Sequence, residues 1–433
     1  KDESIKQSLL AGAAQRAVEN PFDLELGPLL RLELLTLATT EHVLIVTAHH
    51  LICDGWSFGV IVKDLVSLYS GYVGFASGKL DQPASFASYA VALDSLESSK
   101  QAQQDEAYWL EQYSSVPANI DLPTDRPRGS QRTFKSQRID HFLDQDLVER
   151  IKKSGARSGV GFFAALLGGF SSLMQRLSGA TDLVVGVPAA GPLVVGQESL
   201  VGHCVNFLPI RLSCDPAAAS SDLLVATQAR LLDAYEHQSC TFGSMLQQLP
   251  ISRESGRPTL VSVMFNLDQE FGEGDLDCPG LSIKVTTNPR SYEVFELFVN
   301  AVPFDGGLRV ECQFNAHLFD SQTIRSWMRS FESLLRAASE SPDSAICDLD
   351  LTSQEDKDRL KVWNNSDISF SDAALINELV EAQVACNPSH PAIIWGQDSV
   401  GYGELDARAN QIAHCLLKLG AGADTLVGLH VER

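Results

Sequence analysis

The stretch His49-His50-Leu51-Ile52-Cys53-Asp54-Gly55 joins two strongly patterned segments. The apolar run before it, residues 43–48, predicts a strand that is buried on both faces. After it, apolar side chains recur at helical spacing over residues 58–69, and Ser57 is expected to be the N-cap. We therefore expect the stretch to form the loop between a buried strand and a helix.

Two histidines followed by aspartate and glycine in such a loop can carry proton-transfer chemistry. Neutral imidazole has a pKa of about 6.5, so it can accept a proton or hold a hydrogen bond at neutral pH. Adjacent residues at a strand end point in opposite directions, so one histidine can face a channel while the other packs. Asp54 is expected to brace the loop by pairing with an arginine. The N–H of Gly55, at a helix start, can stabilise an oxyanion.

Two other interpretations fit the same residues. The plainer one is a pair of loop histidines followed by an aspartate at a helix start. The other is a serine hydrolase, because Gly55-Trp56-Ser57-Phe58-Gly59 matches the G-x-S-x-G elbow between a strand and a helix. The spacing weighs against the hydrolase, since histidine and aspartate precede the serine inside one loop instead of coming from distant loops.

Elsewhere, segments with helical periodicity alternate with short strand-like segments. Leu30, Leu32 and Leu34 alternate with Arg31 and Glu33, which predicts a half-buried strand. Further strands are expected at residues 183–187, 205–212, 261–267, 292–299, 308–314, 392–395 and 427–431. Helices are expected at residues 105–113, 146–153, 162–177, 320–335, 374–385 and 402–419. This alternation predicts an α/β protein with mixed sheets.

The charge and the composition narrow the classes of partner. The 433 residues carry a net charge of −22, and the isoelectric point is about 4.8. Nucleic acid and anionic lipid both require clustered Lys and Arg, so we expect no nucleic-acid partner. No apolar stretch reaches the roughly 18 residues of a membrane span, so no membrane association is expected.

The spacing of the cysteines and the lack of cofactor motifs predict a chain that binds neither a metal nor a nucleotide. Nine cysteines are scattered singly, without a CxxC pair or a His/Cys metal spacing. This predicts reduced thiols in a cytoplasmic protein that binds no metal. The sequence has no P-loop and no GxGxxG, so no bound nucleotide is expected. The chain begins at Lys1 without a signal sequence, and we expect it to be a piece of a longer protein.

Much of the chain resembles the condensation domains of nonribosomal peptide synthetases. Residues 49–55 are similar to their HHxxxDG motif, and Val201-Gly202-His203-Cys204-Val205-Asn206-Phe207-Leu208-Pro209-Ile210-Arg211 is similar to their (I/V)GxFVNTxxxR motif. Cys204 replaces the usual phenylalanine, and Phe207 the usual threonine. The likeness extends from residue 1 to about residue 350 and includes segments 83–92, 177–188, 237–238 and 252–267.

The resemblance implies a two-lobed fold like that of chloramphenicol acetyltransferase, with a tunnel between the lobes. Upstream and downstream carrier proteins would deliver substrates into the tunnel on their own phosphopantetheine arms. The amine of the downstream aminoacyl thioester would attack the upstream acyl thioester and form an amide. His50 would orient or deprotonate that amine, Asp54 would be structural, and Gly55 would donate to the oxyanion.

Three more residues are expected to support the site. We expect His49 to support the loop and Asn206 to line the tunnel, although Asn206 also fits a plain turn residue at a strand end. Arg211 is the candidate partner of Asp54 within the chain. No catalytic role is expected for His203 or His237.

The resemblance also predicts the domain organisation. Residues 1–125 correspond to the later part of the first lobe, which is expected to be incomplete because two early motifs are missing. Residues 126–345 correspond to the second lobe, and residues 346–372 to a linker. Residues 373–433 contain Tyr402-Gly403-Glu404-Leu405-Asp406 and resemble the start of an adenylation domain, the expected adjoining partner.

Three further points concern catalysis, the substrates and carrier docking. Certain members of this family are non-catalytic docking platforms, but these typically lose the active histidine, and this chain keeps His50. The donor and the acceptor substrate are not specified by these residues. Carrier proteins are usually acidic, so docking on a chain of this charge requires local basic patches. The candidates are Arg126, Arg128, Lys152 and Lys153.

Overall fold

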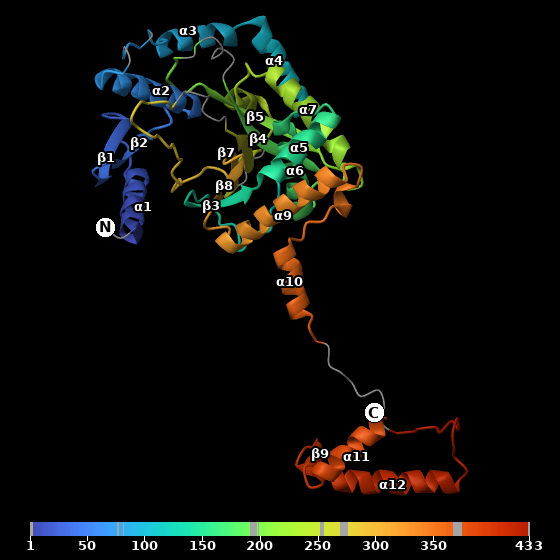
Figure 1. The fold of residues 1–433 in the computed structure, drawn as a ribbon. Coiled ribbons are helices and arrows are strands. Elements are labelled where there is room, and N and C mark those ends of the chain that lie inside the picture. The colour runs from blue at the N-terminus through green and yellow to red at the C-terminus, as the bar shows by residue number, and fades with distance from the viewer. Residues whose placement is uncertain are drawn as a thin grey trace. The chain divides into compact units, whose positions relative to one another are not determined.

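The computed structural model divides into two compact units, Lys1–Lys357 and Asp358–Arg433 (Figure 1). Each unit is described by itself. Residues 252–254, from one of the segments that resemble the family, and residues 367–372 of the predicted linker lie outside the described part of the chain. The described residues are 3–75, 78–80, 82–190, 197, 199–251, 255–268, 276–366 and 375–431.

Helices and strands alternate through the first unit, as the sequence predicts. A final helix, α10 (Gln354–Trp363), crosses the boundary between the two units. In chain order, the elements before it are α1 (Glu3–Glu19), β1 (Leu30–Ala38), β2 (Glu41–Ala48), α2 (Gly55–Tyr72), α3 (Phe86–Glu97), α4 (Lys100–Gln112), β3 (Ser136–Leu143), α5 (Gln145–Arg157), α6 (Phe162–Ser178), β4 (Asp182–Ala190), β5 (Val205–Ser213), α7 (Ser220–Glu236), α8 (Phe242–Gln248), β6 (Val263–Leu267), β7 (Leu297–Phe304), β8 (Gly307–Asn315), α9 (Ser321–Glu340) and the 3₁₀ turn η1 (Ile346–Asp348).

A six-stranded sheet forms the centre of the first unit, in the order β3-β8-β7-β6-β4-β5. The pairs β4–β6 and β6–β7 are parallel, and the remaining neighbours are antiparallel. The sheet is therefore mixed, which confirms the predicted α/β class with mixed sheets.

One face of this sheet is apolar and is covered by helices α5, α6, α7 and α9 (Figure 1). Phe170 of α6 stacks on Phe265 of β6 at 5.1 Å between ring centroids, and it meets Phe331 of α9 edge-on at 6.1 Å. Gly169 lets these helices approach closely, because a Cβ there would lie 2.5 Å from Leu335 Cδ2. The apolar periodicity of α6 thus builds the core of the unit.

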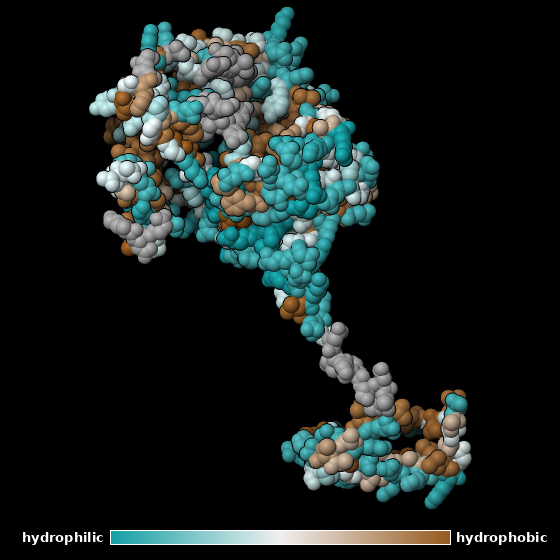
Figure 2. All heavy atoms as spheres, viewed as in Figure 1, coloured by the Kyte–Doolittle hydropathy of each residue, from teal (hydrophilic) through white to brown (hydrophobic). Residues whose placement is uncertain are grey.

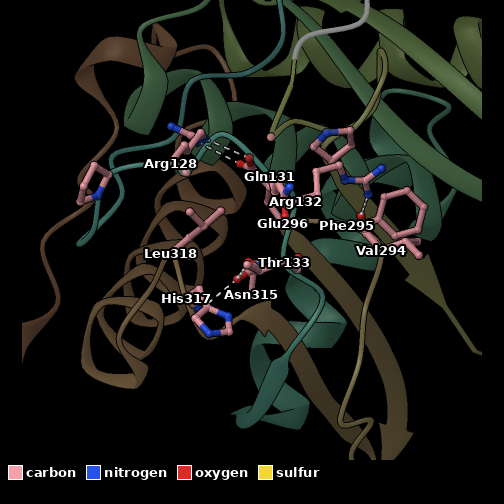
Figure 3. A pocket seen from close by; sticks show the side chains of 14 residues that line it. Arg128, Gln131, Arg132, Thr133, Val294, Phe295, Glu296, Asn315, His317 and Leu318 are labelled. Atoms are coloured by element: carbon pink, nitrogen blue, oxygen red, sulfur yellow. Dashed lines mark hydrogen bonds and ion pairs between the residues drawn. The ribbon is translucent and has the colours of Figure 1, made fainter.

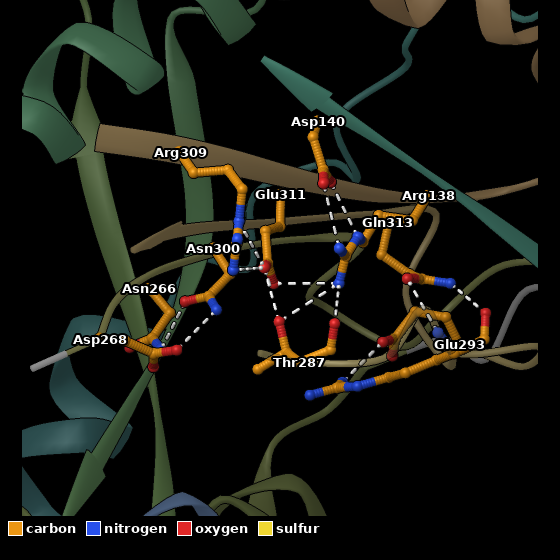
Figure 4. A network of polar contacts seen from close by, with 11 residues as sticks. Arg138, Asp140, Asn266, Asp268, Thr287, Glu293, Asn300, Arg309, Glu311 and Gln313 are labelled. Carbon is orange, nitrogen blue, oxygen red and sulfur yellow. Dashed lines mark hydrogen bonds and ion pairs between the residues drawn. The ribbon is translucent and has the colours of Figure 1, made fainter. Parts of the chain in front are cut away.

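The opposite face of the same sheet is polar, because side chains alternate along each strand (Figure 4). Asn266 Nδ2 of β6 donates to Asn300 Oδ1 of β7 at 2.9 Å, and Arg138 of β3 pairs with Glu311 of β8 at 3.4 Å. Thr287, from the segment before β7, donates its hydroxyl to Glu311 at 2.6 Å. The segment that contains Thr287 therefore lies across the polar face.

The two-stranded sheet β1–β2 differs from the prediction. Arg31 donates to the carbonyls of Ala17 and Asn20 near the end of α1. In β2, only Ile45 is buried, and it pairs with Glu33 of β1. The strand at residues 43–48 is therefore not buried on both faces. Leu30, Leu32 and Leu34 of β1 are exposed instead of half-buried, whereas Leu35 and Leu37 are partly buried. Apolar side chains gather over this sheet in Figure 2.

Other boundaries also shift. Helix α2 begins at Gly55 with Asp54 as its N-cap, so the prediction that Ser57 is the cap is wrong. The strand expected at residues 292–299 begins only at Leu297, and residues 427–431 form no strand. Elements that the sequence pattern did not predict include α1, α3, α7, α8, β3, β10 and α10.

The second unit is small. It contains α11 (Ile376–Cys386), the antiparallel pair β9 (Pro391–Trp395) and β10 (Asp398–Gly401), and α12 (Tyr402–Lys418). Many of its apolar side chains are exposed, including Trp395 at 84%. None of the residues described in its helices and strands is classed as buried. The unit therefore has no core of its own among the described residues.

No single helix in the described part of the chain is both long and apolar enough to cross a membrane. Helices α5 and α6 reach the required length and composition only as a pair, and this pair is bent by 102°.

Candidate active site

The loop between β2 and α2 holds the two histidines. The N–H of His49 donates to Leu29 O at 2.8 Å, and Ile52 N donates to His49 O at 3.1 Å, which closes a turn. His49 Nδ1 accepts from Leu51 N at 3.2 Å, and its ring meets Phe22 edge-on at 5.7 Å between centroids. The structure thus places His49 as a support of the loop, and His50 projects from the same turn.

Asp54 fastens this loop to a distant part of the chain. Its carboxylate is buried, with only 5% of the residue exposed. Oδ1 accepts from Ser57 N at 2.9 Å and from Ser57 Oγ at 2.8 Å, as an N-cap does. Oδ2 accepts from Cys204 N at 2.8 Å. The partners of Asp54 are therefore backbone and hydroxyl donors, and not the expected arginine.

Ser57 completes the connection. Its Oγ accepts from Gly202 N at 3.0 Å and lies 2.8 Å from Gly202 O. The side chain is buried, with 1% of the residue exposed. A hydrolase elbow requires an exposed nucleophile at the apex of a turn, whereas this hydroxyl is enclosed and hydrogen-bonded. These contacts argue against the serine hydrolase.

The loop before β5 is shaped to fit against α2 and α3. A Cβ at Gly202 would lie 2.1 Å from Cδ2 of Phe86, so only glycine permits this approach. Tyr89 of α3 packs with Leu200 and Cys204 in a small buried apolar cluster. Burial on one side and the hydrogen bonds to α2 on the other therefore hold residues 202–204 in place.

His203 lies between these two anchored residues, and its ring reaches His50. The two Nδ1 atoms are 3.0 Å apart, and the ring centroids are 5.0 Å apart with an interplanar angle of 80°. Both residues remain exposed. From the sequence alone, we expect no catalytic role for His203. The only signal that could have suggested otherwise was a histidine inside the second family-like motif.

The surroundings of His50 favour its neutral form. Partial burial of the imidazole is the largest cause that lowers its pKa below the ordinary value of 6.5, and the nearby His203 ring and the Arg290 guanidinium act in the same direction. A hydrogen bond to its own backbone and the carboxylate of Asp54 oppose this shift without cancelling it. At neutral pH the imidazole therefore has a free lone pair.

This shift predicts the pH dependence of any reaction that needs neutral His50. Because the pKa of His50 is lowered below 6.5, the neutral form dominates at pH 7, so the rate should change little around neutrality and should fall on the acid side with a midpoint below 6.5. Single-turnover rates between about pH 5 and pH 8 measure this limb. An acid limb with its midpoint above 6.5 would contradict the assigned environment of His50.

Arg211 is not the partner of Asp54, which corrects the sequence-based expectation. Its Nη2 lies 2.6 Å from Asp182 Oδ2, and its Nε donates to Asp182 Oδ1 at 2.9 Å. Nη1 donates to the carbonyls of Gln112 and Ser115. Arg211 therefore links β5 to the neighbouring strand β4 and to the end of α4. A guanidinium has several N–H donors, so it can bind a carboxylate and nearby carbonyls at the same time.

Asn206 and Gly55 have different surroundings. Asn206 Nδ2 donates to Gln238 O at 2.7 Å, and its Oδ1 accepts from Phe207 N at 2.8 Å. These contacts tie the start of β5 to the segment between α7 and α8. Gly55 is exposed and is the first residue of α2, so its N–H has no acceptor within the helix. It is one of the N–H groups at the helix start beside the His50 loop.

A pocket elsewhere in the unit shares no lining residue with the His50–His203 contact (Figure 3). Arg128 and Glu296 line it and form a bidentate ion pair at 3.0 and 2.9 Å. Arg126 pairs with Asp320, and Lys152 with Glu149. These three candidates for carrier docking are therefore engaged with carboxylates of the same chain. No group of three metal-ligating side chains occurs among the described residues.

Comparisons with known proteins agree with this architecture. Residues 1–361 match the family model described as Condensation domain. Malpinin synthetase of Mortierella alpina is 30% identical over 442 residues, covering 99% of this chain and 6% of that protein. Bacitracin synthase 1 of Bacillus licheniformis is 30% identical over 419 residues, covering 95% and 8%. The chain thus spans a small part of these relatives.

Solved structures show the same fold. The first condensation domain of the CDA synthetase superposes with a TM-score of 0.70 at 18% identity, covering 79% of this chain and 75% of that one. Holo-AB3403, a four-domain nonribosomal peptide synthetase, gives a TM-score of 0.72 at 20% identity, covering 96% and 32%. These matches confirm the predicted condensation-domain fold, and with the family match over residues 1–361 they show that the chain belongs to the condensation-domain family.

Proposed function

We propose that this chain catalyses amide formation between two carrier-bound thioesters in nonribosomal peptide biosynthesis. The observation that carries the proposal is the position of the His50 imidazole, on a loop that buried hydrogen bonds of Asp54 hold in place. Family membership supports it, as does the likeness to a four-domain nonribosomal peptide synthetase. Amide synthesis from thioesters requires a proton acceptor but no metal and no nucleotide at this site.

The proposed reaction balances as follows. The amine nitrogen of the downstream aminoacyl thioester attacks the carbonyl carbon of the upstream thioester, so a C–N bond forms. His50 Nε2 hydrogen-bonds the amine and takes up one of its protons. The C–S bond then breaks, and the proton passes to the departing sulfur as a thiol. The amide product remains on the downstream carrier, and His50 returns to its neutral form.

Each neighbouring residue has a distinct role in this proposal. Asp54 fixes the loop and takes no part in proton transfer, since its oxygens already accept three hydrogen bonds. Gly55 N–H donates to the oxyanion that forms when the amine attacks. Orientation of the tethered amine against the thioester carbonyl supplies a large part of the rate, because both reactants are held.

The partners follow from the same proposal. Upstream and downstream carrier proteins bring the substrates on their own phosphopantetheine arms, and this chain contributes no cofactor. We propose that residues 373–433 are the start of an adenylation domain that adjoins the condensation domain. The four-domain synthetase that covers 96% of this chain supports this assignment. Residues 1–125 and 126–345 are proposed as the two lobes.

The test uses the parent protein with two separately loaded carriers. One carrier holds an acyl thioester and the other an aminoacyl thioester, and intact-mass spectrometry follows both. We expect the acyl mass to move from the upstream to the downstream carrier only when the protein is present. Loss of the acyl group to water without gain on the downstream carrier would instead indicate a hydrolase. No transfer with any loaded pair would favour a docking platform.

A further inference from the structure

We infer that His203 is a positioning residue for His50: the contact between their Nδ1 atoms fixes the tautomer that leaves His50 Nε2 free to accept a proton. The inference deepens the proposed function and rests on it. It starts from the 3.0 Å separation of two ring nitrogens that belong to residues 153 positions apart in the chain. At this distance, one nitrogen donates and the other accepts.

The direction of this hydrogen bond follows from the reaction proposed above. The contact with His203 occupies Nδ1 of His50, so Nε2 is the nitrogen left to face the attacking amine. A neutral imidazole carries one hydrogen, and a nitrogen that accepts a proton must carry the lone pair. The hydrogen of His50 is therefore on Nδ1, and His203 Nδ1 is the acceptor.

The backbone around His203 makes this contact rigid. Gly202 N donates to Ser57 Oγ, and Cys204 N donates to Asp54 Oδ2. His203 lies between them, so its Cα cannot shift without breaking buried hydrogen bonds. The same two residues, Asp54 and Ser57, therefore anchor the His50 loop and aim His203 at His50. One set of hydrogen bonds positions both sides of the pair.

The charged and titratable groups that act on the pKa of His50 are His203, Arg290 and the carboxylate of Asp54. Arg290 is itself paired with Glu293 at 3.0 Å.

Two variants of the same shape separate positioning from packing. His203→Asn keeps an oxygen acceptor where Nδ1 stood, whereas His203→Leu has similar branching and no acceptor. His203 is exposed, so neither replacement opens a core cavity. For His203→Leu we expect kcat to fall by about 10- to 100-fold, the size typical of groups that orient a functional histidine, with KM for both loaded carriers nearly unchanged. His203→Asn should retain most of the activity.

A second readout does not depend on turnover. Histidine-selective ¹⁵N spectra of the intact chain report which ring nitrogen carries hydrogen, and His50→Gln identifies the His50 signals. We expect a protonated Nδ1 on His50 in the native chain and in His203→Asn, with a shift toward protonated Nε2 in His203→Leu. Equal kcat for the Leu and Asn variants, or an unchanged tautomer in His203→Leu, would overturn the inference. If His50→Ala itself retains full activity, the proposed function fails, while the spectra still decide the pairing.

Discussion

Replacing His50 with alanine is expected to lower the single-turnover rate of amide formation by about 10²- to 10⁴-fold, the usual contribution of a positioned acid–base group. The reason is that the variant lacks the neutral imidazole that accepts the proton of the attacking amine. Carrier binding should change little, because the imidazole is a small part of any carrier interface. Rapid quench of two loaded carriers with the parent protein, followed by mass spectrometry, measures the rate.

His42→Ala is the matched control for this variant. His42 lies in β2, is exposed, and contacts Thr36 Oγ1 at 3.3 Å within the same two-stranded sheet. The substitution removes an imidazole from the strand that precedes the His50 loop and leaves the contacts of His50 unchanged. We expect a rate within about twofold of the native protein, as for ordinary surface substitutions. If both variants retain native rates, His50 has no part in the chemistry.

Asp54→Asn is expected to destabilise the first unit by about 2–4 kcal/mol, even though the two side chains have nearly the same shape. Both carboxylate oxygens accept hydrogen bonds, Oδ1 from Ser57 and Oδ2 from Cys204 N. An amide has one oxygen and one NH₂ group, so in either orientation a donor faces a buried donor. The free energy of unfolding, from urea denaturation followed by tryptophan fluorescence, measures the loss.

Asp144→Asn provides the control, because Asp144 caps α5 in a similar way but at an exposed position. Its Oδ1 accepts from Leu147 N at 2.7 Å, and asparagine is an equally good N-cap. We expect a change below about 1 kcal/mol there. Equal effects of the two substitutions would mean that the contact between Asp54 and Cys204 does not hold the two loops together.

Local patterns predicted the elements that carry the site. The strand, loop and helix around His50 follow from an apolar run, a short polar gap and a 3.6-residue period, and the structure has β2, the loop and α2 there. Helix α6 and strand β5 were likewise predicted from their periodicity. These signals are local, because each depends on neighbours within a few residues.

The contacts between loops were not predictable from such patterns. Asp54 reaches Cys204 across 150 positions, and periodicity does not say which loops meet. Arg211 was assigned to the wrong carboxylate for the same reason, although its partner Asp182 lies on the adjacent strand β4. Cross-strand pairing is a known source of such ion pairs and would have been the better guide.

The strand β1 shows a second limit. Alternation of leucine with charged residues says that a strand has two different faces, but not which face another element covers. Here the exposed side carries Leu30, Leu32 and Leu34, while Arg31 reaches the carbonyls of Ala17 and Asn20 near the end of α1. Only the position of α1, which the sequence pattern did not predict, decides between the two faces.

The most direct test of the role of His50 is a structure of the parent protein with a non-hydrolysable aminoacyl analogue held on the downstream phosphopantetheine arm. We predict that the amine nitrogen lies within hydrogen-bonding distance of His50 Nε2, about 2.7–3.2 Å, while His50 Nδ1 remains paired with His203. An amine bound on the far side of the loop, or an Nε2 enclosed by protein and out of reach of the arm, would contradict this role.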